Sequence, residues 1–195
     1  MSSKNVVKDK VQRAGLNKWY KNGCIGTFKW ATGVGKTRPG VLAAQYVASK
    51  IPDARILILT PTQVIRDNAW REEFIKWGCR SVYKNNVETE CIQIACKFEN
   101  EHFDLVIADE VHNYIPLTDE YVYFKFFENN TFDRILGLSA SIEEEIIPKL
   151  NTIAPIVDTI DLNEAVELGL VSPFKVFNIP VELSEDEKEE YDKAN

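Results

Sequence analysis

Residues 31–40 read ATGVGKTRPG, and this stretch decides how the chain folds. The run before it, GCIGTFKW at residues 23–30, is largely apolar and predicts a short strand. The run after it, residues 37–50, predicts a helix that tolerates its proline in the first turn. A strand that leads through a glycine-containing loop into a helix is typical of anion-binding units, because the helix N-terminus carries partial positive charge. The stretch therefore predicts a loop that holds phosphate.

The individual residues of the loop favour a nucleotide as the source of that phosphate. Gly33 and Gly35 allow backbone N–H groups to converge on one anion. Lys36 would reach the terminal phosphates, and the hydroxyl of Thr37 would bind a magnesium ion. The general phosphate-loop pattern has a further glycine where Trp30 stands, so the strict pattern fails at one position. The strand before the loop and the helix after it still favour a nucleotide site.

Apolar runs alternate with helix-like segments along the rest of the chain. Strands are predicted at residues 55–60 (RILILT), 91–95, 103–108 (FDLVIA) and 134–138 (RILGL). Helices are predicted at residues 62–77, 118–129, 142–150 and 161–170. This alternation predicts an α/β fold, in which a mainly parallel sheet carries helices on both faces.

Two adjacent carboxylates end the most apolar of the later strands. Asp109 and Glu110 lie in the run FDLVIADEVH at residues 103–112. Ligands of parallel sheets collect at the carboxyl ends of the strands, and two carboxylates there are costly unless something uses them. Asp109 would hold a magnesium ion that bridges the phosphates, and Glu110 would polarise a water molecule aimed at the last phosphate.

Composition and charge narrow the class of protein. The chain has 195 residues, a net charge of −7, two histidines and four cysteines without a CxxC pair. The cysteine spacing argues against a zinc site, and the charge argues against attachment to nucleic acid by bulk positive charge. No apolar run is long enough to span a membrane or to serve as a secretion signal. We therefore expect a cytoplasmic protein without a membrane partner.

Together, ATGVGKT and DEVH resemble the first RecA-like domain of a superfamily-2 DExH helicase or translocase. The chain is similar in this to restriction-enzyme motor subunits and DNA-repair translocases. The resemblance implies a RecA-like P-loop NTPase domain with ATP and magnesium as cofactors. It implies catalytic roles for Lys36, Asp109 and Glu110, with Thr37 and Asp109 as metal ligands. Nucleotide contacts are implied for Thr32, Gly33, Val34, Gly35, Lys36, Thr37 and His112.

Two shorter motifs follow in the order that the same group has. LTPT at residues 59–62 resembles the segment that contacts the sugar–phosphate backbone of the tracked strand. LSAS at residues 138–141 resembles the motif that links hydrolysis to movement. The resemblance therefore implies nucleic-acid contacts for Thr60, Pro61 and Thr62, and a coupling role for Ser139 and Ser141.

Upstream of the loop, QRAGLNKW at residues 12–19 resembles the glutamine-containing segment that reads adenine. A glutamine amide can pair with N6 and N7 of that base. The resemblance thus implies that Gln12 binds the base. Val11 stands where an aromatic residue often precedes the glutamine, so Trp19 or Tyr20 would either stack on the base or belong to the core.

The resemblance also predicts a domain organisation. Residues 1–170 would form the RecA-like ATP-binding domain, and residues 171–195 would form an exit strand and a charged helix that lead towards a second RecA-like domain. That second domain would supply an arginine worth about a thousandfold or more in rate, so the chain alone should hydrolyse ATP very slowly. The nucleic-acid partner would be a single strand or a duplex, with DNA favoured over RNA.

Two alternatives to a motor stay open at this stage. One is a nucleotide-gated nucleic-acid-binding module without significant hydrolysis, which would have no use for the carboxylate of Glu110. The other is a different P-loop NTPase, such as a small-molecule kinase. A kinase would need a lid or an acceptor pocket, and the sequence shows no such insertion.

Overall fold

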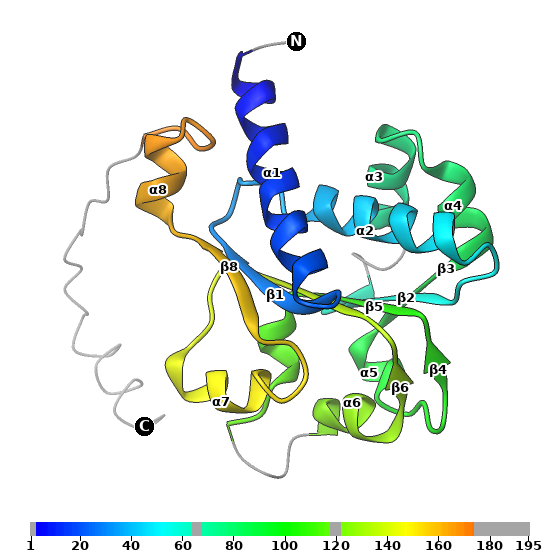
Figure 1. Cartoon of the computed structure of the whole chain (residues 1–195). Coiled ribbons are helices and arrows are strands. Elements are labelled where there is room, and N and C mark those ends of the chain that lie inside the picture. The colour runs from blue at the N-terminus through cyan, green and yellow to red at the C-terminus, as the bar shows by residue number, and fades with distance from the viewer. Residues whose placement is uncertain (1–2, 64–67, 118–121, 174–195) are drawn as a thin grey trace, which may run out of the picture.

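A six-stranded parallel sheet forms the centre of the molecule (Figure 1). The computed structural model describes residues 3–63, 68–117 and 122–173. In the sheet, the strands follow the order β3-β2-β5-β7-β1-β8, and every neighbouring pair is parallel. Their bounds are β1 (Ile25–Trp30), β2 (Ile56–Thr60), β3 (Val87–Cys91), β5 (Leu105–Asp109), β7 (Ile135–Ser139) and β8 (Ile156–Ile160). The predicted α/β fold with a mainly parallel sheet is confirmed.

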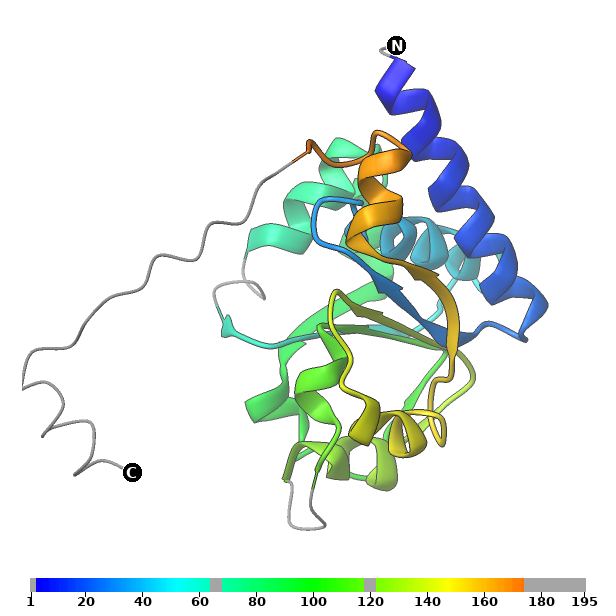
Figure 2. The same ribbon diagram turned by 90° about the vertical axis from the view of Figure 1, so that its left-hand side faces the viewer.

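Helices cover both faces of this sheet (Figures 1 and 2). One face carries α1 (Ser3–Lys21), α2 (Thr37–Lys50), α3 (Trp70–Lys76), α4 (Arg80–Asn86) and α8 (Leu162–Glu167). The other carries α5 (Ile92–Ala95), α6 (Lys125–Asn129) and α7 (Ile147–Leu150), with 3₁₀ turns at Val111–Tyr114, Val122–Phe124 and Glu144–Ile146. A minor two-stranded sheet pairs β4 (His102–Phe103) with β6 (Thr131–Phe132).

The apolar strands supply side chains to two separate cores, one beneath each helical layer. On β2, Ile56 and Ile58 belong to the core beneath α1 and α2, and Leu57 and Leu59 belong to the core on the opposite face. All four side chains are buried. Successive residues of a strand point to opposite faces, so a strand covered on both sides must be apolar at every position. This requirement explains why RILILT was recognisable in the sequence.

The predicted strand at residues 91–95 is wrong. The strand there is Val87–Cys91, and Ile92–Ala95 form the short helix α5. β3 lies at an edge of the sheet and its side chains are mostly only half-buried, so its sequence VETEC is polar and carries little strand signal. Ile92 and Ala95 are both buried because one helical turn brings them to the same face.

Several elements of the fold were not expected from the sequence, among them α4 and β6. The largest are the edge strand β8 and the long helix α1, which packs against α2, β1 and β8. The helix predicted at residues 118–129 is found only as the 3₁₀ turn and α6, and residues 118–121 lie outside the described part of the chain. Most of the predicted exit segment, 174–195, also lies outside it, so the domain boundary at residue 170 stays a prediction.

Trp30, which stands where the phosphate-loop pattern has a glycine, is a core residue. It is fully buried, stacks on Phe28 with ring centroids 4.5 Å apart, and donates its indole N–H to Asp158 at 3.1 Å. Helix α1 crosses directly over it at Gly15, where an added Cβ would lie 2.3 Å from Cζ2 of the tryptophan ring. Gly15 therefore provides the space that the large side chain of Trp30 occupies.

Candidate active site

The loop between β1 and α2 has the backbone conformation that its glycines predict. Gly33 and Gly35 adopt φ angles of +92° and +90°, a region that side-chain-bearing residues rarely enter. Thr32 is exposed at the tip of the loop, whereas the side chain of Val34 is fully buried. Val34 can therefore contribute only its backbone to a bound phosphate. Thr37 is the first residue of α2, and its side chain is half-buried.

Lys36 extends from this loop across the carboxyl edge of the sheet. Its Nζ donates to the carbonyl oxygen of Trp30 at 3.1 Å. Burial lowers the pKa of Lys36, and the carboxylates of Glu110 and Asp109 act in the opposite direction. The ammonium group thus lies within electrostatic range of both acids.

The strand order explains why these groups meet. Only β7 separates β1 from β5, so the end of β5 lies about 10 Å from the end of β1, at two strand spacings. Asp109 is the last residue of β5 and pairs in register with Leu138 of β7. The carboxylates of Asp109 and Glu110 and the ammonium of Lys36 are therefore brought to one edge of the sheet.

Asp109 has an unusual protonation equilibrium for a carboxyl group. Its pKa is raised to about 6, chiefly by burial; the indole N–H of Trp70 opposes this rise, and the nearby Glu110 contributes to it. The attraction of Lys36 acts to lower the pKa again, by a smaller amount. A divalent cation in contact with Asp109 would replace the solvation that burial removes, which fits the predicted role of this residue as a metal ligand.

Trp70 is a site residue that sequence reasoning missed. It lies within the helix predicted at residues 62–77 and its ring is buried, but its Nε1 donates to Oδ2 of Asp109 at 3.1 Å. Gly40 of α2 makes room for the ring, because a Cβ there would lie 2.7 Å from Trp70 Cη2. The hydroxyl of Tyr114 also donates to the backbone carbonyl of Asp109. Buried aromatic side chains thus orient the acid from two sides.

Glu110 and His112 connect the acidic segment to the end of β7. Glu110 has a left-handed backbone, with φ +51°, and its carboxylate lies 3.5 Å from Nδ1 of His112. The same Nδ1 lies 2.7 Å from Oγ of Ser139, which itself donates to the carbonyl of Ser141 at 2.6 Å. Because that hydroxyl proton is committed to Ser141, we infer that His112 carries its proton on Nδ1. The predicted coupling segment is thus bonded to the predicted acidic motif.

The contact between His112 and the end of β7 reaches the surface at Ser141, which is exposed, whereas Ser139 is buried. A cavity of about 310 Å³ opens beside them, with His112, Ser141 and Glu143 in its lining. A ligand or partner that enters this cavity would meet both motifs at once.

Gln12 lies against the phosphate loop rather than in open space. Its side chain is buried, and its Nε2 donates to the carbonyls of Val34 at 3.1 Å and Gly35 at 3.0 Å. Its Oε1 accepts a hydrogen bond from Arg38 at 2.8 Å. To read adenine, the amide would have to exchange these partners, so that role stays a prediction.

The LTPT segment at the end of β2 divides into a buried and an exposed part. Thr60 is fully buried, and its hydroxyl donates to the carbonyls of Thr62 at 3.1 Å and Glu90 at 3.4 Å. The carbonyl of Pro61 accepts from the side chain of Gln93 at 3.1 Å, and Thr62 is exposed. Thr60 thus holds the turn in shape, and Thr62 lies at the surface of the same turn.

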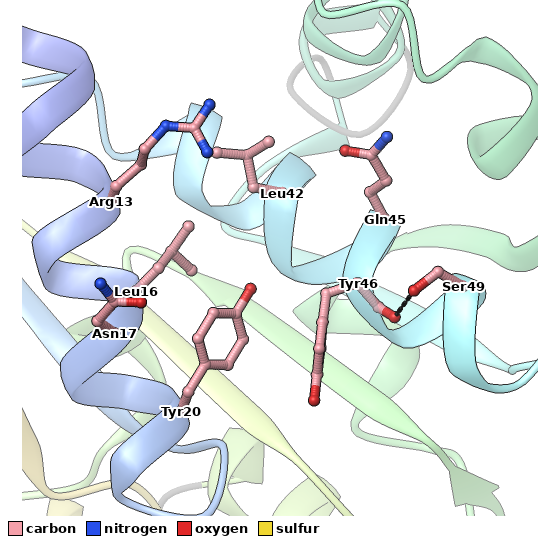
Figure 3. A pocket seen from close by; sticks show the side chains of 8 residues that line it. All are labelled: Arg13, Leu16, Asn17, Tyr20, Leu42, Gln45, Tyr46 and Ser49. Atoms are coloured by element: carbon pink, nitrogen blue, oxygen red, sulfur yellow. Dashed lines mark hydrogen bonds between the residues drawn. The ribbon is translucent and has the colours of Figure 1, made fainter.

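A separate cavity of about 560 Å³ lies between α1 and α2 (Figure 3). Tyr20 and Tyr46 face each other across it with ring centroids 4.7 Å apart, and Arg13 lies at one end. Of the residues considered for nucleotide binding, its lining includes Tyr20, a candidate for base stacking. Trp19, the other candidate for base stacking, is fully buried and donates to the carbonyl of Ile135, so it belongs to the core.

Comparison with known proteins identifies the fold. No family model and no curated protein matches the sequence. The SWI2/SNF2 ATPase core of Sulfolobus solfataricus, solved with double-stranded DNA, aligns with a TM-score of 0.55 and 16% identity over 67% of this chain and 31% of its own. The Hef helicase domain of Pyrococcus furiosus gives 0.55 and 18% over 80% and 37% of the two chains. The UvsW helicase of bacteriophage T4 gives 0.55 and 14% over 75% and 58%.

The extent of these alignments limits what they establish. This chain spans from about a third to somewhat over half of the length of each structure. Among the described residues, no helix is long and apolar enough to cross a membrane.

The sheet order, the phosphate-loop geometry and the structural neighbours lead to one conclusion: the chain has the RecA-like α/β fold of helicase and SWI2/SNF2 ATPase cores.

Proposed function

We propose that this chain is the first motor domain of an ATP-dependent nucleic-acid helicase or translocase. The observation that carries the proposal is the meeting of Lys36, Asp109 and Glu110 at one edge of the parallel sheet, next to a loop with two glycines at positive φ. Ligands of open α/β sheets bind at this edge. A kinase would use a similar loop, but it has no need for the contact between the acidic segment and Ser139.

The residues present fit ATP and a magnesium ion. The loop supplies backbone N–H groups and Lys36 a positive charge for the phosphates. Thr37 and Asp109 supply the oxygen atoms that magnesium prefers, and bound magnesium would neutralise charge on the terminal phosphates. Glu110, about one-third exposed, would orient and deprotonate the attacking water. His112 would sense the state of the site and transmit it through Ser139.

The proposed partners are a nucleic acid and a second RecA-like domain. Thr62 with the backbone of Thr60 and Pro61 would contact phosphates of the strand, which positions the protein without reading sequence. DNA is the favoured partner, and the SWI2/SNF2 neighbour was solved with double-stranded DNA. A second domain would close over the nucleotide and supply a transition-state arginine.

Nucleotide binding by the purified chain tests the proposal. Titration with fluorescent ADP and magnesium should show binding that Lys36→Ala weakens at least about tenfold, since a direct phosphate contact is worth more than 1.4 kcal/mol. Lys76→Ala is the matched control, because Lys76 is an exposed lysine that pairs with Glu73. Equal affinity of the parent and Lys36→Ala would refute the proposal.

Hydrolysis separates a motor from a nucleotide-gated binding module. With single-stranded DNA and the second domain present, Glu110→Gln should lower ATP turnover by about a hundredfold or more, the usual contribution of a general base. ADP affinity should stay near that of the parent. Unchanged turnover in Glu110→Gln would favour the gated module.

A further inference from the structure

Residues of α1 donate hydrogen bonds to the carbonyl groups of the phosphate loop. Nζ of Lys8 donates to the carbonyl of Gly33 at 2.8 Å. The amide of Gln12 donates to the carbonyls of Val34 and Gly35 at 3.1 and 3.0 Å. Three successive carbonyl groups of the loop therefore face α1.

The direction of these carbonyls determines where the loop N–H groups point. In a planar trans peptide, the C=O and the N–H of one unit point in opposite directions. Because the carbonyls of Val34 and Gly35 point to Gln12, the N–H groups of Gly35 and Lys36 point away from it. Successive N–H groups on one side form an anion-binding concavity. Gln12 thus shapes the phosphate site from the side opposite to the phosphate.

Arg38 fixes which end of the Gln12 amide faces the loop. Its Nη1 donates to Gln12 Oε1 at 2.8 Å. A guanidinium group is only a donor, so the amide oxygen must face Arg38 and the NH₂ group must face the loop carbonyls. Without Arg38, the amide could rotate and present its oxygen to carbonyl oxygens, which would repel it.

Arg38 is itself held on several sides. Its Nη2 pairs with the carboxylate of Asp9, its guanidinium lies 4.3 Å from the ring centroid of Trp77, and its side chain is 13% exposed. Hydrogen bonds from Arg38 and Arg13 keep the pKa of Asp9 below its ordinary value, so the partner of Arg38 stays charged. The fork geometry that reaches two acceptors at once is specific to arginine.

We propose, on the basis of the function proposed above, that Arg38 is a positioning residue of the nucleotide site. It fixes the amide of Gln12, and Gln12 sets the direction of the loop N–H groups that receive the phosphates. Arg38 acts through Gln12 and does not itself touch the nucleotide. The direct hold on the phosphate loop thus comes from Gln12 of α1, outside the phosphate-loop motif, and Arg38 of α2 fixes the orientation of that amide.

Hydrogen exchange in the nucleotide-free protein tests the first half of this proposal. Arg38→Met should accelerate amide exchange in a peptide that covers residues 31–37 by about tenfold, because a held loop opens less often. Gln12→Ala should do the same, and Asp9→Asn, a milder change at the surface, should give a smaller increase. Arg13→Met is the control, since Arg13 is an exposed arginine whose side chain pairs with Asp9. Unchanged exchange in Arg38→Met would overturn the proposal.

A double-mutant cycle on ADP binding tests whether Arg38 acts through Gln12. Arg38→Met alone should weaken magnesium-ADP binding about tenfold, and the double variant Arg38→Met/Gln12→Ala should bind no more weakly than Gln12→Ala. Additive losses would mean that Arg38 contacts the nucleotide directly, and they would overturn the proposal. Arg38→Lys should recover only part of the loss, because an ammonium group cannot reproduce the fork.

These results separate the inference from the proposed function. If the parent protein and Lys36→Ala both fail to bind ADP, the proposed function fails, and hydrogen exchange alone decides the role of Arg38 in holding the loop. If the parent binds ADP and Lys36→Ala does not, while Arg38→Met binds like the parent, the inference fails and the proposed function stands. Thermal unfolding of each variant shows whether a loss comes from misfolding.

Discussion

Trp70 and Asp109 show how a single hydrogen bond can set the working range of a site. Burial raises the pKa of Asp109 to about 6, and the indole of Trp70 opposes this shift by donating to the carboxylate. A metal ligand must be deprotonated. Magnesium-dependent nucleotide binding should therefore be lost as the pH falls through about 6, because protons compete with the metal for Asp109.

The variant Trp70→Phe should move this pH dependence upward. A hydrogen bond to a charged group contributes about 1.5 kcal/mol, which corresponds to about one pH unit. The midpoint of magnesium-ADP binding, measured between pH 5 and pH 8, should shift to a higher pH by that amount. Trp19→Phe is the matched control, since it also removes a buried indole donor, one that binds the carbonyl of Ile135. A midpoint that is the same in parent and Trp70→Phe would contradict the argument.

At the residue scale, the sequence predicted the proposed chemical groups of the site, but it did not predict the side chains that hold those groups in place. Lys36, Asp109 and Glu110 could be proposed from the sequence because residues of these types, placed after strands, suit the chemistry of phosphate and magnesium; their roles stay predictions. Trp70 and Arg38 were not identified. Their roles depend on which side chain packs against which, and a tryptophan in a helical stripe carries the same signal whether or not its N–H has a charged partner.

The contact between α1 and β1 is the element-scale feature that supports the loop. Gly15 lets the helix lie directly on the ring of Trp30, the last residue of the strand before the loop. Lys8 and Gln12 of the same helix bind the loop carbonyls. The position of α1 on the sheet and the shape of the loop are therefore linked through one glycine.

Replacement of Gly15 should weaken the packing of α1 on β1. In an exposed helix, Gly→Ala stabilises by about 1 kcal/mol. In Gly15→Ala, however, the new Cβ would lie 2.3 Å from Trp30 and 2.9 Å from Oδ2 of Asp158. We expect a net loss of about 1–3 kcal/mol in the free energy of unfolding, measured with urea. Ala14→Ser, at the exposed neighbouring position, should change stability by less than about 0.5 kcal/mol. A Gly15→Ala protein as stable as the parent would contradict the close contact.

The elements differ in how visible they were in the sequence. β2, β5 and β7 lie inside the sheet and are buried on both faces, so they were found as apolar runs. The sequence analysis misplaced β3 and missed β8, which are the two edge strands of the sheet. An edge strand has a neighbouring strand along only one of its edges, so fewer of its residues need to be apolar. α1 was missed although it has a buried stripe at Gln12, Gly15, Leu16 and Trp19. Two members of that stripe are not apolar, and their burial becomes clear only from the loop and the ring they contact.

On the scale of the whole molecule, net charge limits how the protein can hold a nucleic acid. The chain carries −7 and its proposed strand contact is a short turn with one exposed threonine. Under the proposed function, nucleic-acid binding would depend on a few phosphate contacts and on the proposed second domain rather than on a broad basic surface.

The salt dependence of DNA binding measures the number of those contacts. Each neutralised phosphate of a single strand contributes about 0.7 to the slope of log affinity against log salt. For two phosphates, fluorescence anisotropy with a labelled single strand should give a slope of about −1.4 between roughly 50 and 200 mM salt. A slope of about −4 or steeper would show a basic track with many more phosphate contacts and would contradict this prediction.

The strand order also has a consequence for how the protein is made. β1 pairs only with β7 and β8, at Ile135–Ser139 and Ile156–Ile160, so both of its neighbours come more than a hundred residues later in the chain. On the ribosome, residues 25–30 emerge long before either neighbour has been translated. Until synthesis has passed residue 160, this segment lacks both of its partner strands, so its apolar side chains stay exposed to aggregation during that time.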